Sequence, residues 1–157
     1  MTPGDRLICL FIEDYLVGDT FTNWPLHITI VPWFRSEISD EIITKGLLKV
    51  TNNSSVLSLK VGEEKLFGSK KNKPVNIIES SQDLINIESR VRKIIKLNSS
   101  WIVDETTKQK RTFTPHITVQ NSERLHEGDN IDLNKIFIVK QLGDYKEVVG
   151  KAELKNE

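Results

Sequence analysis

Apolar and polar positions along the chain predict alternating strands and helices. Apolar residues have helical spacing in two segments, 39–52 and 81–97, and the first opens on a serine followed by two acidic residues, which is typical of a helix N-terminus. Short apolar or alternating runs bounded by glycine, proline or acidic residues predict strands. Pro32 and Gly62 are expected to end two of these strands, and 18–23 is expected to be a loop. The predicted strands are 7–12, 26–31, 56–61, 75–79, 113–120, 136–142 and 147–154.

The order of these elements repeats along the chain. Each half contains a strand with a histidine, a helix and partner strands, so the sequence predicts an α+β fold made of two pseudo-symmetric halves with antiparallel sheets. A sheet must bury one face, which places the helices outside and leaves the other face of the sheets to line a central cleft. The length is that of one domain, 1–157.

The composition is that of a folded protein without a general attraction for nucleic acid. The 22 Lys and Arg residues balance 22 Asp and Glu residues, so any nucleic-acid substrate is expected to be a terminus or a small nucleotide rather than a long duplex. The apolar run 7–12 is too short for a signal peptide or a membrane span. We therefore expect a cytoplasmic, monomeric protein without a membrane contact, in which the lone Cys9 is buried.

Two of the three histidines begin the same tripeptide. These are His27-Ile28-Thr29 and His116-Ile117-Thr118, and each closely follows a proline. Side chains alternate between the faces of a strand, so each histidine shares a face with the threonine two residues later, roughly 7 Å away, while the isoleucine turns to the core. If the two halves pack about an approximate two-fold axis, both imidazoles and both hydroxyls converge on one cleft.

This arrangement suits chemistry at phosphorus. An in-line displacement needs a base at the attacking oxygen and an acid at the leaving oxygen, and the imidazoles of His27 and His116 can supply both. The hydroxyls of Thr29 and Thr118 can donate hydrogen bonds to the non-bridging oxygens, where charge accumulates. The scheme requires no metal and no cofactor. It leaves open which histidine is the base.

Simpler interpretations exist for each motif. One His-Ile-Thr alone is more often a satisfied polar strand, but two copies in a chain with so little histidine favour function. A metal site is a weaker alternative, because the two histidines lack a third ligand and the short spacings of metal motifs. The third histidine, His126, lies in a polar loop and is expected to be solvated.

The sequence resembles the 2H phosphoesterase superfamily, which includes 2′-5′ RNA ligase-like proteins and cyclic nucleotide phosphodiesterases. The resemblance rests on the segments HITIVPWF at 27–34 and PHITV at 115–119. It implies a bilobal, duplicated fold, catalysis by the paired histidines, phosphate binding by the paired threonines, and hydrolysis of 2′,3′-cyclic phosphates or 2′-5′ linkages. Some relatives carry an arginine soon after the second motif; here Gln120 follows, and the nearest arginine, Arg124, is not assigned that role.

Further residues are candidates for substrate contact. Two basic clusters occur, 70–73 and 108–111, and in the second Lys110 and Arg111 precede the second motif closely enough to overhang the cleft. Aromatic residues near the motifs are candidates to stack a base, although such residues more often pack in the core or at its rim. The aromatic candidates are Trp24, Trp33, Trp101 and Phe113.

The alternative function is a non-catalytic module that binds an RNA end or a cyclic nucleotide in the same cleft.

Overall fold

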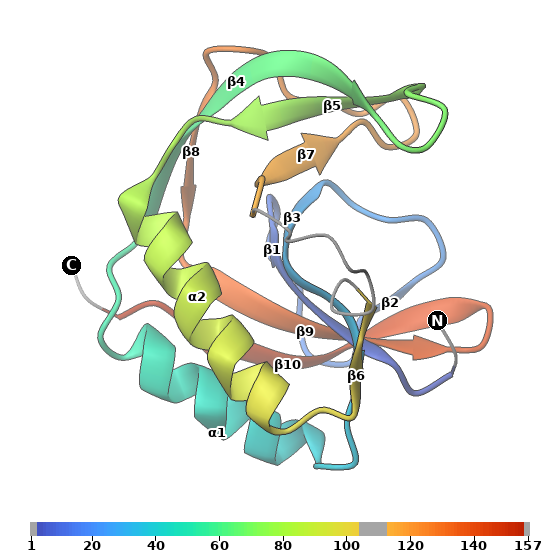
Figure 1. The fold of residues 1–157 in the computed structure, drawn as a ribbon, viewed down its shortest axis with the longest axis vertical. Coiled ribbons are helices and arrows are strands. Elements are labelled where there is room, and N and C mark those ends of the chain that lie inside the picture. The colour runs from blue at the N-terminus through green and yellow to red at the C-terminus, as the bar shows by residue number, and fades with distance from the viewer. Residues whose placement is uncertain (1–2, 104–112, 156–157) are drawn as a thin grey trace.

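The computed structural model describes residues 3–103 and 113–155 and confirms the α+β fold. Figure 1 shows a strongly curled antiparallel sheet with two helices on one side of it. Within the described residues, the strands of the sheet are ordered β2-β10-β9-β1-β3-β7-β5-β4-β8, with β6 paired to β3. The elements are β1 (Arg6–Phe11), β2 (Thr20–Phe21), β3 (His27–Arg35), α1 (Asp40–Thr51), β4 (Leu57–Phe67), β5 (Lys73–Ile78), α2 (Gln82–Leu97), β6 (Trp101–Ile102), β7 (His116–Thr118), β8 (Asn130–Leu133), β9 (Lys135–Leu142) and β10 (Tyr145–Glu153).

Both helices begin as the sequence predicts. The hydroxyl of Ser39 accepts a hydrogen bond from the backbone N–H of Ile42, and the hydroxyl of Ser81 accepts one from the N–H of Leu84. Each serine satisfies one of the backbone donors that a helix N-terminus leaves without an intrahelical partner. The apolar stripes of α1 and α2 then face the sheet.

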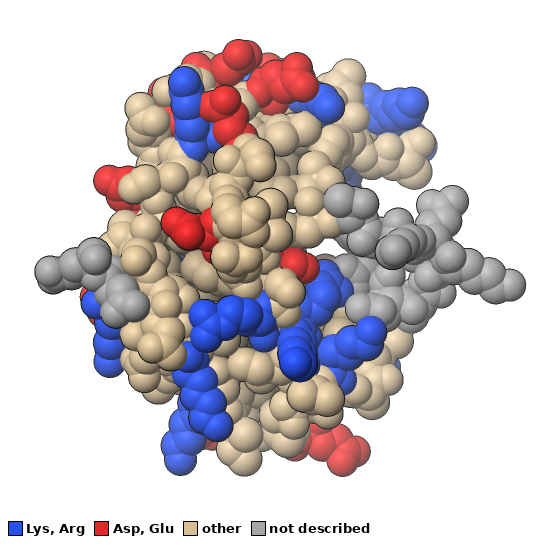
Figure 2. Space-filling model, turned by 60° about the vertical axis from the view of Figure 1, so that its left-hand side comes forward, with Lys and Arg blue, Asp and Glu red and all other residues tan. Residues whose placement is uncertain are grey.

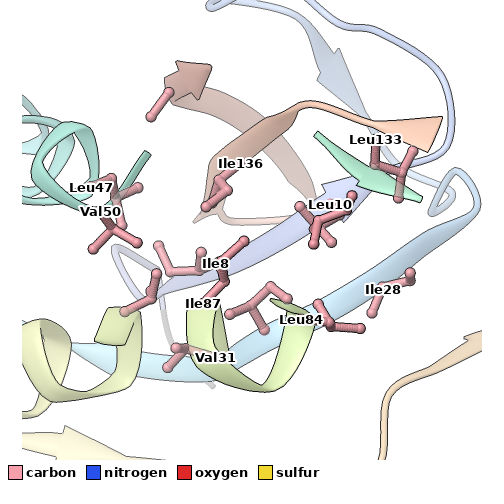
Figure 3. Close-up of a cluster of buried hydrophobic side chains, with 14 of the residues drawn as sticks. Ile8, Leu10, Ile28, Val31, Leu47, Val50, Leu84, Ile87, Leu133 and Ile136 are labelled. Atoms are coloured by element: carbon pink, nitrogen blue, oxygen red, sulfur yellow. The ribbon is translucent and has the colours of Figure 1, made fainter. Parts of the chain in front are cut away.

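One large apolar cluster holds the helices against the sheet. It joins α1 and α2 to the buried side of β1, β3, β4, β9 and β10, and Figure 3 shows side chains of the two helices meeting those of β1 and β3. Because these side chains are almost fully buried, this cluster supplies most of the apolar burial that fixes the curl of the sheet. Its members include Ile8, Leu10, Ile28, Val31, Leu47, Val50, Leu84, Ile87, Leu133 and Ile136.

A smaller apolar cluster lies on the opposite face of the sheet. Alternating residues of β1 and β9 form it, with Cys9 opposite Phe137 and Leu7 opposite Val139. Partly buried aromatic residues from 15–33 pack over it. Cys9 is buried, as predicted. This face also carries the polar side chains of the His-Ile-Thr strand, since Cys9 pairs with Thr29.

Bulges explain why two strands continue past their predicted ends. Strand β3 runs through Pro32, because the register with β1 shifts there: Ile8 pairs with Val31 whereas Arg6 pairs with Phe34. Strand β4 runs through Gly62, where the register with β5 also shifts. A Cβ at Gly62 would lie 2.9 Å from the carbonyl oxygen of Ile77, so only glycine fits this close approach without a shift.

The remaining differences concern short strands. The predicted loop at 18–23 contains β2, which pairs with β10, and no signal in the sequence predicted β6 or β8. The strand predicted over 113–120 is limited to His116–Thr118. Among the described helices, none is long and apolar enough to cross a membrane.

Candidate active site

The two His-Ile-Thr strands lie side by side at the centre of the sheet. β3 and β7 are antiparallel and pair at Ile28 and Ile117, both of which face the core. This register sets His27 opposite Thr118 and Thr29 opposite His116. Residues opposite one another on antiparallel strands share a face, so all four polar side chains project from the same face of the sheet. The structure therefore brings the two predicted histidines and the two predicted threonines together.

The two imidazoles are held in the same way. Nδ1 of His27 lies 2.8 Å from the carbonyl oxygen of Pro25, and Nδ1 of His116 lies 2.8 Å from that of Thr114. A carbonyl oxygen only accepts, so Nδ1 carries the proton in each ring and donates it. In the neutral ring, Nε2 then has a free lone pair. Both histidines are thus oriented by the backbone two residues earlier, with the second nitrogen left for a substrate.

Each imidazole also packs against an aromatic ring from another part of the chain. The ring centroids of Trp24 and His27 are 4.4 Å apart, with an angle of 30° between the ring planes. The ring centroid of Phe11 lies 6.3 Å from that of His27. The ring of Phe67, at the end of β4, lies 4.9 Å from that of His116 at an angle of 66°. Aromatic rings from different segments of the chain therefore pack against each of the two histidines.

The electrostatic setting of His27 favours its neutral form. Burial lowers the pKa of His27 below its ordinary value, and the hydrogen bond to the carbonyl of Pro25 raises it in part. The positive charge that His116 can carry lowers it further. His27 is therefore suited to accept a proton at neutral pH.

Four groups on one face give the site its chemical capability. A phosphate between the two rings can receive a proton from one imidazole while the other accepts one from an attacking oxygen. The hydroxyls of Thr29 and Thr118 lie on the same face and can donate to its non-bridging oxygens. Among the described residues, no group of three or more His, Cys, Asp or Glu side chains could hold a metal ion.

Arg124 and His126, which the sequence analysis did not assign to the site, lie outside it. Arg124 donates from Nη2 to Glu64 at 2.9 Å and to Asn76 at 3.3 Å. Asn76 pairs with the core-facing Ile117, so this guanidinium lies on the face of the sheet away from the histidines. The remaining histidine, His126, is exposed, as predicted. Lys110 and Arg111 lie outside the described residues.

The aromatic candidates divide between the site and its surroundings. Trp24 contacts His27, and the ring of Trp33 lies 6.1 Å from that of Trp24. Trp101 is placed elsewhere, because its ring stacks under the guanidinium of Arg35 at 4.9 Å at the far end of β3. Phe113 packs against the large core cluster. Sequence reasoning missed the ring beside the second histidine, since nothing near Phe67 in the chain marks it as part of a motif.

Comparisons with known proteins agree with this fold. A family model for the 2′-5′ RNA ligase superfamily matches residues 12–133. The fold is similar to that of TT0787 of Thermus thermophilus, at 14% identity and a TM-score of 0.63 over 98% of this chain and 99% of that chain. It is also similar to E. coli LigT complexed with 3′-AMP, at 12% identity and a TM-score of 0.61 over 99% of this chain and 100% of that chain. A search of curated protein sequences finds no significant match.

Proposed function

Because the chain belongs to the 2′-5′ RNA ligase superfamily, we propose that it is a metal-independent phosphodiesterase acting on a nucleotide or an RNA terminus. The scissile bond is that of a 2′,3′-cyclic phosphate or a 2′-5′ linkage. The observation that carries this proposal is the register of β3 and β7, which puts two imidazoles and two hydroxyls on one face. Backbone carbonyls support it further by orienting both rings alike.

In this mechanism His27 is the base and His116 is the acid. The ring of His27 is partly buried against Trp24 and Phe11, so we assign it as the neutral partner. Its Nε2 takes a proton from water as the water oxygen bonds to phosphorus. The bond from phosphorus to a ribose oxygen breaks, and the imidazolium of His116 gives its proton to that oxygen. Exchange with solvent then restores both rings for the next turnover.

The threonines hold the phosphate during this displacement. Thr29 lies opposite His116 and Thr118 lies opposite His27, so each hydroxyl is beside the histidine of the other strand. A phosphate that touches both rings therefore has a hydroxyl on each side. Hydrogen bonds to the non-bridging oxygens strengthen as negative charge accumulates there, which lowers the barrier rather than only tightening binding.

The size of the substrate follows from the charge of the chain and from its relatives. The balance of 22 basic and 22 acidic residues gives no general attraction for a long polyanion. E. coli LigT, whose fold is similar, has been crystallised with 3′-AMP and with phosphate, which supports a ligand of nucleotide size. A single domain over 1–157, a monomeric state and a cytoplasmic location remain predictions of the sequence.

A panel of substrates tests the proposal. Purified protein is incubated with 2′,3′-cyclic nucleotides and with 2′-5′-linked dinucleotides, in buffer with and without EDTA, and the products are separated by chromatography. We expect a nucleoside monophosphate or a cleaved dinucleotide, formed at equal rates in both buffers. Binding without product on every substrate would favour the non-catalytic module instead. Activity lost in EDTA and restored by a divalent cation would refute the metal-independent mechanism.

Thr29→Val and Thr118→Val provide the matched variants for the phosphate contacts. Each removes one hydroxyl and keeps the branched shape that suits a strand. We expect kcat to fall roughly 10²–10³-fold for each, the usual effect of losing one donor to a developing oxyanion. A fall in affinity alone, with kcat unchanged, would mean that the hydroxyls bind the ground state only.

A further inference from the structure

We propose that the end of the β4–β5 hairpin forms a second subsite for the nucleoside that carries the scissile phosphate. In this hairpin subsite, made of Lys65, Phe67 and Lys73, the aromatic ring stacks on the base and the two ammonium groups bind the 5′ phosphate of the same nucleoside. The substrate class is then an RNA end that bears a phosphate on both sides of its last ribose. This inference rests on the proposed function.

Phe67 links the hairpin to the catalytic centre. Its ring lies 4.9 Å from that of His116, so a nucleoside whose ribose oxygen leaves toward His116 lies beside it. The side chain is only partly buried, which leaves part of its surface for a ligand. Stacking of a base on an exposed aromatic ring tolerates every base, because each has a π-face.

The two lysines point to the same side of the sheet as the site. Lys65 pairs with Val75, and Val75 pairs with Thr118, so Lys65 is in register with the phosphate-binding threonine across two strand spacings, roughly 9.5 Å. Lys73 lies two residues before Val75 on β5 and therefore shares its face. Its backbone is roughly 8 Å from that of Thr118 by the same spacings. One nucleotide unit and an extended lysine side chain span such distances.

The charge of the hairpin fits an anionic group. Lys73 has no ion-pair partner within the described part of the chain, and Lys65 meets only the exposed Glu63 at 3.5 Å. An exposed pair of this kind is weak and is readily exchanged for a phosphate. The turn adds Lys70 and Lys71, and Figure 1 shows it reaching beyond the end of β7. Figure 2 shows basic side chains at the upper right, at the height of this turn.

Elsewhere on the view of Figure 2, acidic side chains gather mainly at the top and basic ones across the lower half, at the height of α1 and α2. The zero net charge thus conceals local fields. Basic residues of the helices lie on the side of the sheet away from the histidines, so they are not placed to contact a nucleotide in the site. The hairpin lysines lie on the same side of the sheet as the histidines, so they are placed to contact a nucleotide there.

The test compares two substrates that differ in the 5′ phosphate. Rates are measured for 2′,3′-cyclic AMP and for the dinucleotide ApA that ends in a 2′,3′-cyclic phosphate, with wild type and with the double variant Lys65→Ala/Lys73→Ala. We expect wild type to prefer the dinucleotide by roughly tenfold in kcat/KM. The double variant should lose this preference while its rate on 2′,3′-cyclic AMP stays within about twofold. Lys60→Ala is the matched control, because Lys60 is also on β4 but its ammonium group forms an ion pair with Glu79.

The outcomes separate the inference from the function on which it rests. Turnover of 2′,3′-cyclic AMP by wild type with no preference for the dinucleotide, or an equal loss in the Lys60→Ala control, overturns the subsite and leaves the phosphodiesterase intact. Failure of wild type on both substrates overturns the subsite, and failure on the 2′-5′-linked dinucleotides as well overturns the phosphodiesterase. For Phe67, the variant Phe67→Leu should raise KM on both 2′,3′-cyclic AMP and 2′,3′-cyclic UMP, because either base loses its stacking partner. A fall in kcat alone, equal for both bases, would show that the ring only positions His116.

Discussion

Replacing His27 by asparagine separates the chemistry of this side chain from its structural role. The amide nitrogen of asparagine can take the place of Nδ1 and donate to the carbonyl of Pro25, which the ring contacts at 2.8 Å. No group remains in the place of Nε2, so His27→Asn keeps the local hydrogen bond and removes the proton acceptor. A loss of activity in this variant therefore reports the missing base rather than a collapsed strand.

The expected size of the loss follows from what the site retains. The acid His116 and the hydroxyls of Thr29 and Thr118 are untouched, so only general-base catalysis disappears. Its usual contribution of about 10²–10⁴ in rate corresponds to roughly 2.7–5.5 kcal/mol of barrier. Stability should change less, because only the ring contacts with Trp24 and Phe11 are lost, at a cost of about 0.5–1.5 kcal/mol each.

The assay is the pH dependence of kcat/KM on a 2′,3′-cyclic nucleotide. In wild type, activity should rise with pH as His27 loses its proton, at a pH below the ordinary titration of histidine because burial lowers its pKa. His27→Asn should lack this rising limb as well as most of the rate. His116→Asn is the counterpart for the acid, since the ring of His116 is bound to a carbonyl in the same way. A rising limb that persists in His27→Asn would refute the assignment of His27 as base.

Three further predictions concern stability and reactivity. Because the folded chain holds the pKa of His27 below its ordinary 6.5, the unfolded chain binds the proton more readily, so the melting temperature should fall as pH drops below about 6.5, and less steeply in His27→Asn. Gly150→Ala should cost about 1–3 kcal/mol in urea unfolding, since its Cβ would lie 2.6 Å from Ile138 and from Thr44; an unchanged midpoint would contradict the packing. The thiol of Cys9, whose pKa burial raises, should react with a thiol reagent only as fast as the chain unfolds; rapid labelling of native protein would contradict its burial.

The sequence predicted the helices and the placement of both His-Ile-Thr tripeptides on strands because local signals and tertiary burial agree there. The predicted helix 81–97 differs from α2 only by its capping serine. The two tripeptides alternate as strands must, and the core takes the isoleucine of each. What alternation could not reveal is that β3 and β7 are direct neighbours, since pairing between residues 28 and 117 depends on the whole fold.

Other features could not be predicted because they are created by partners distant in the chain. Pro32 and Gly62 indicate strand ends locally, but β3 and β4 continue through them because the register with β1 and with β5 shifts at bulges there. The short strand β2 exists only because β10 runs beside it. Pro115 has no N–H to donate, which helps to confine β7 to three residues. The ring of Phe67 reaches His116 only through the curl of the sheet, so no spacing in the sequence marks it.

The short pairing between β3 and β7 leaves the alignment of the two histidines to side-chain packing. His27 and His116 stand on different strands, and the isoleucine that follows each of them, Ile28 or Ile117, belongs to the one large apolar cluster behind the sheet. A side chain removed from that cluster should therefore disturb the spacing of the two nitrogens as well as the stability. A ligand that touches both strands should in turn raise the melting temperature.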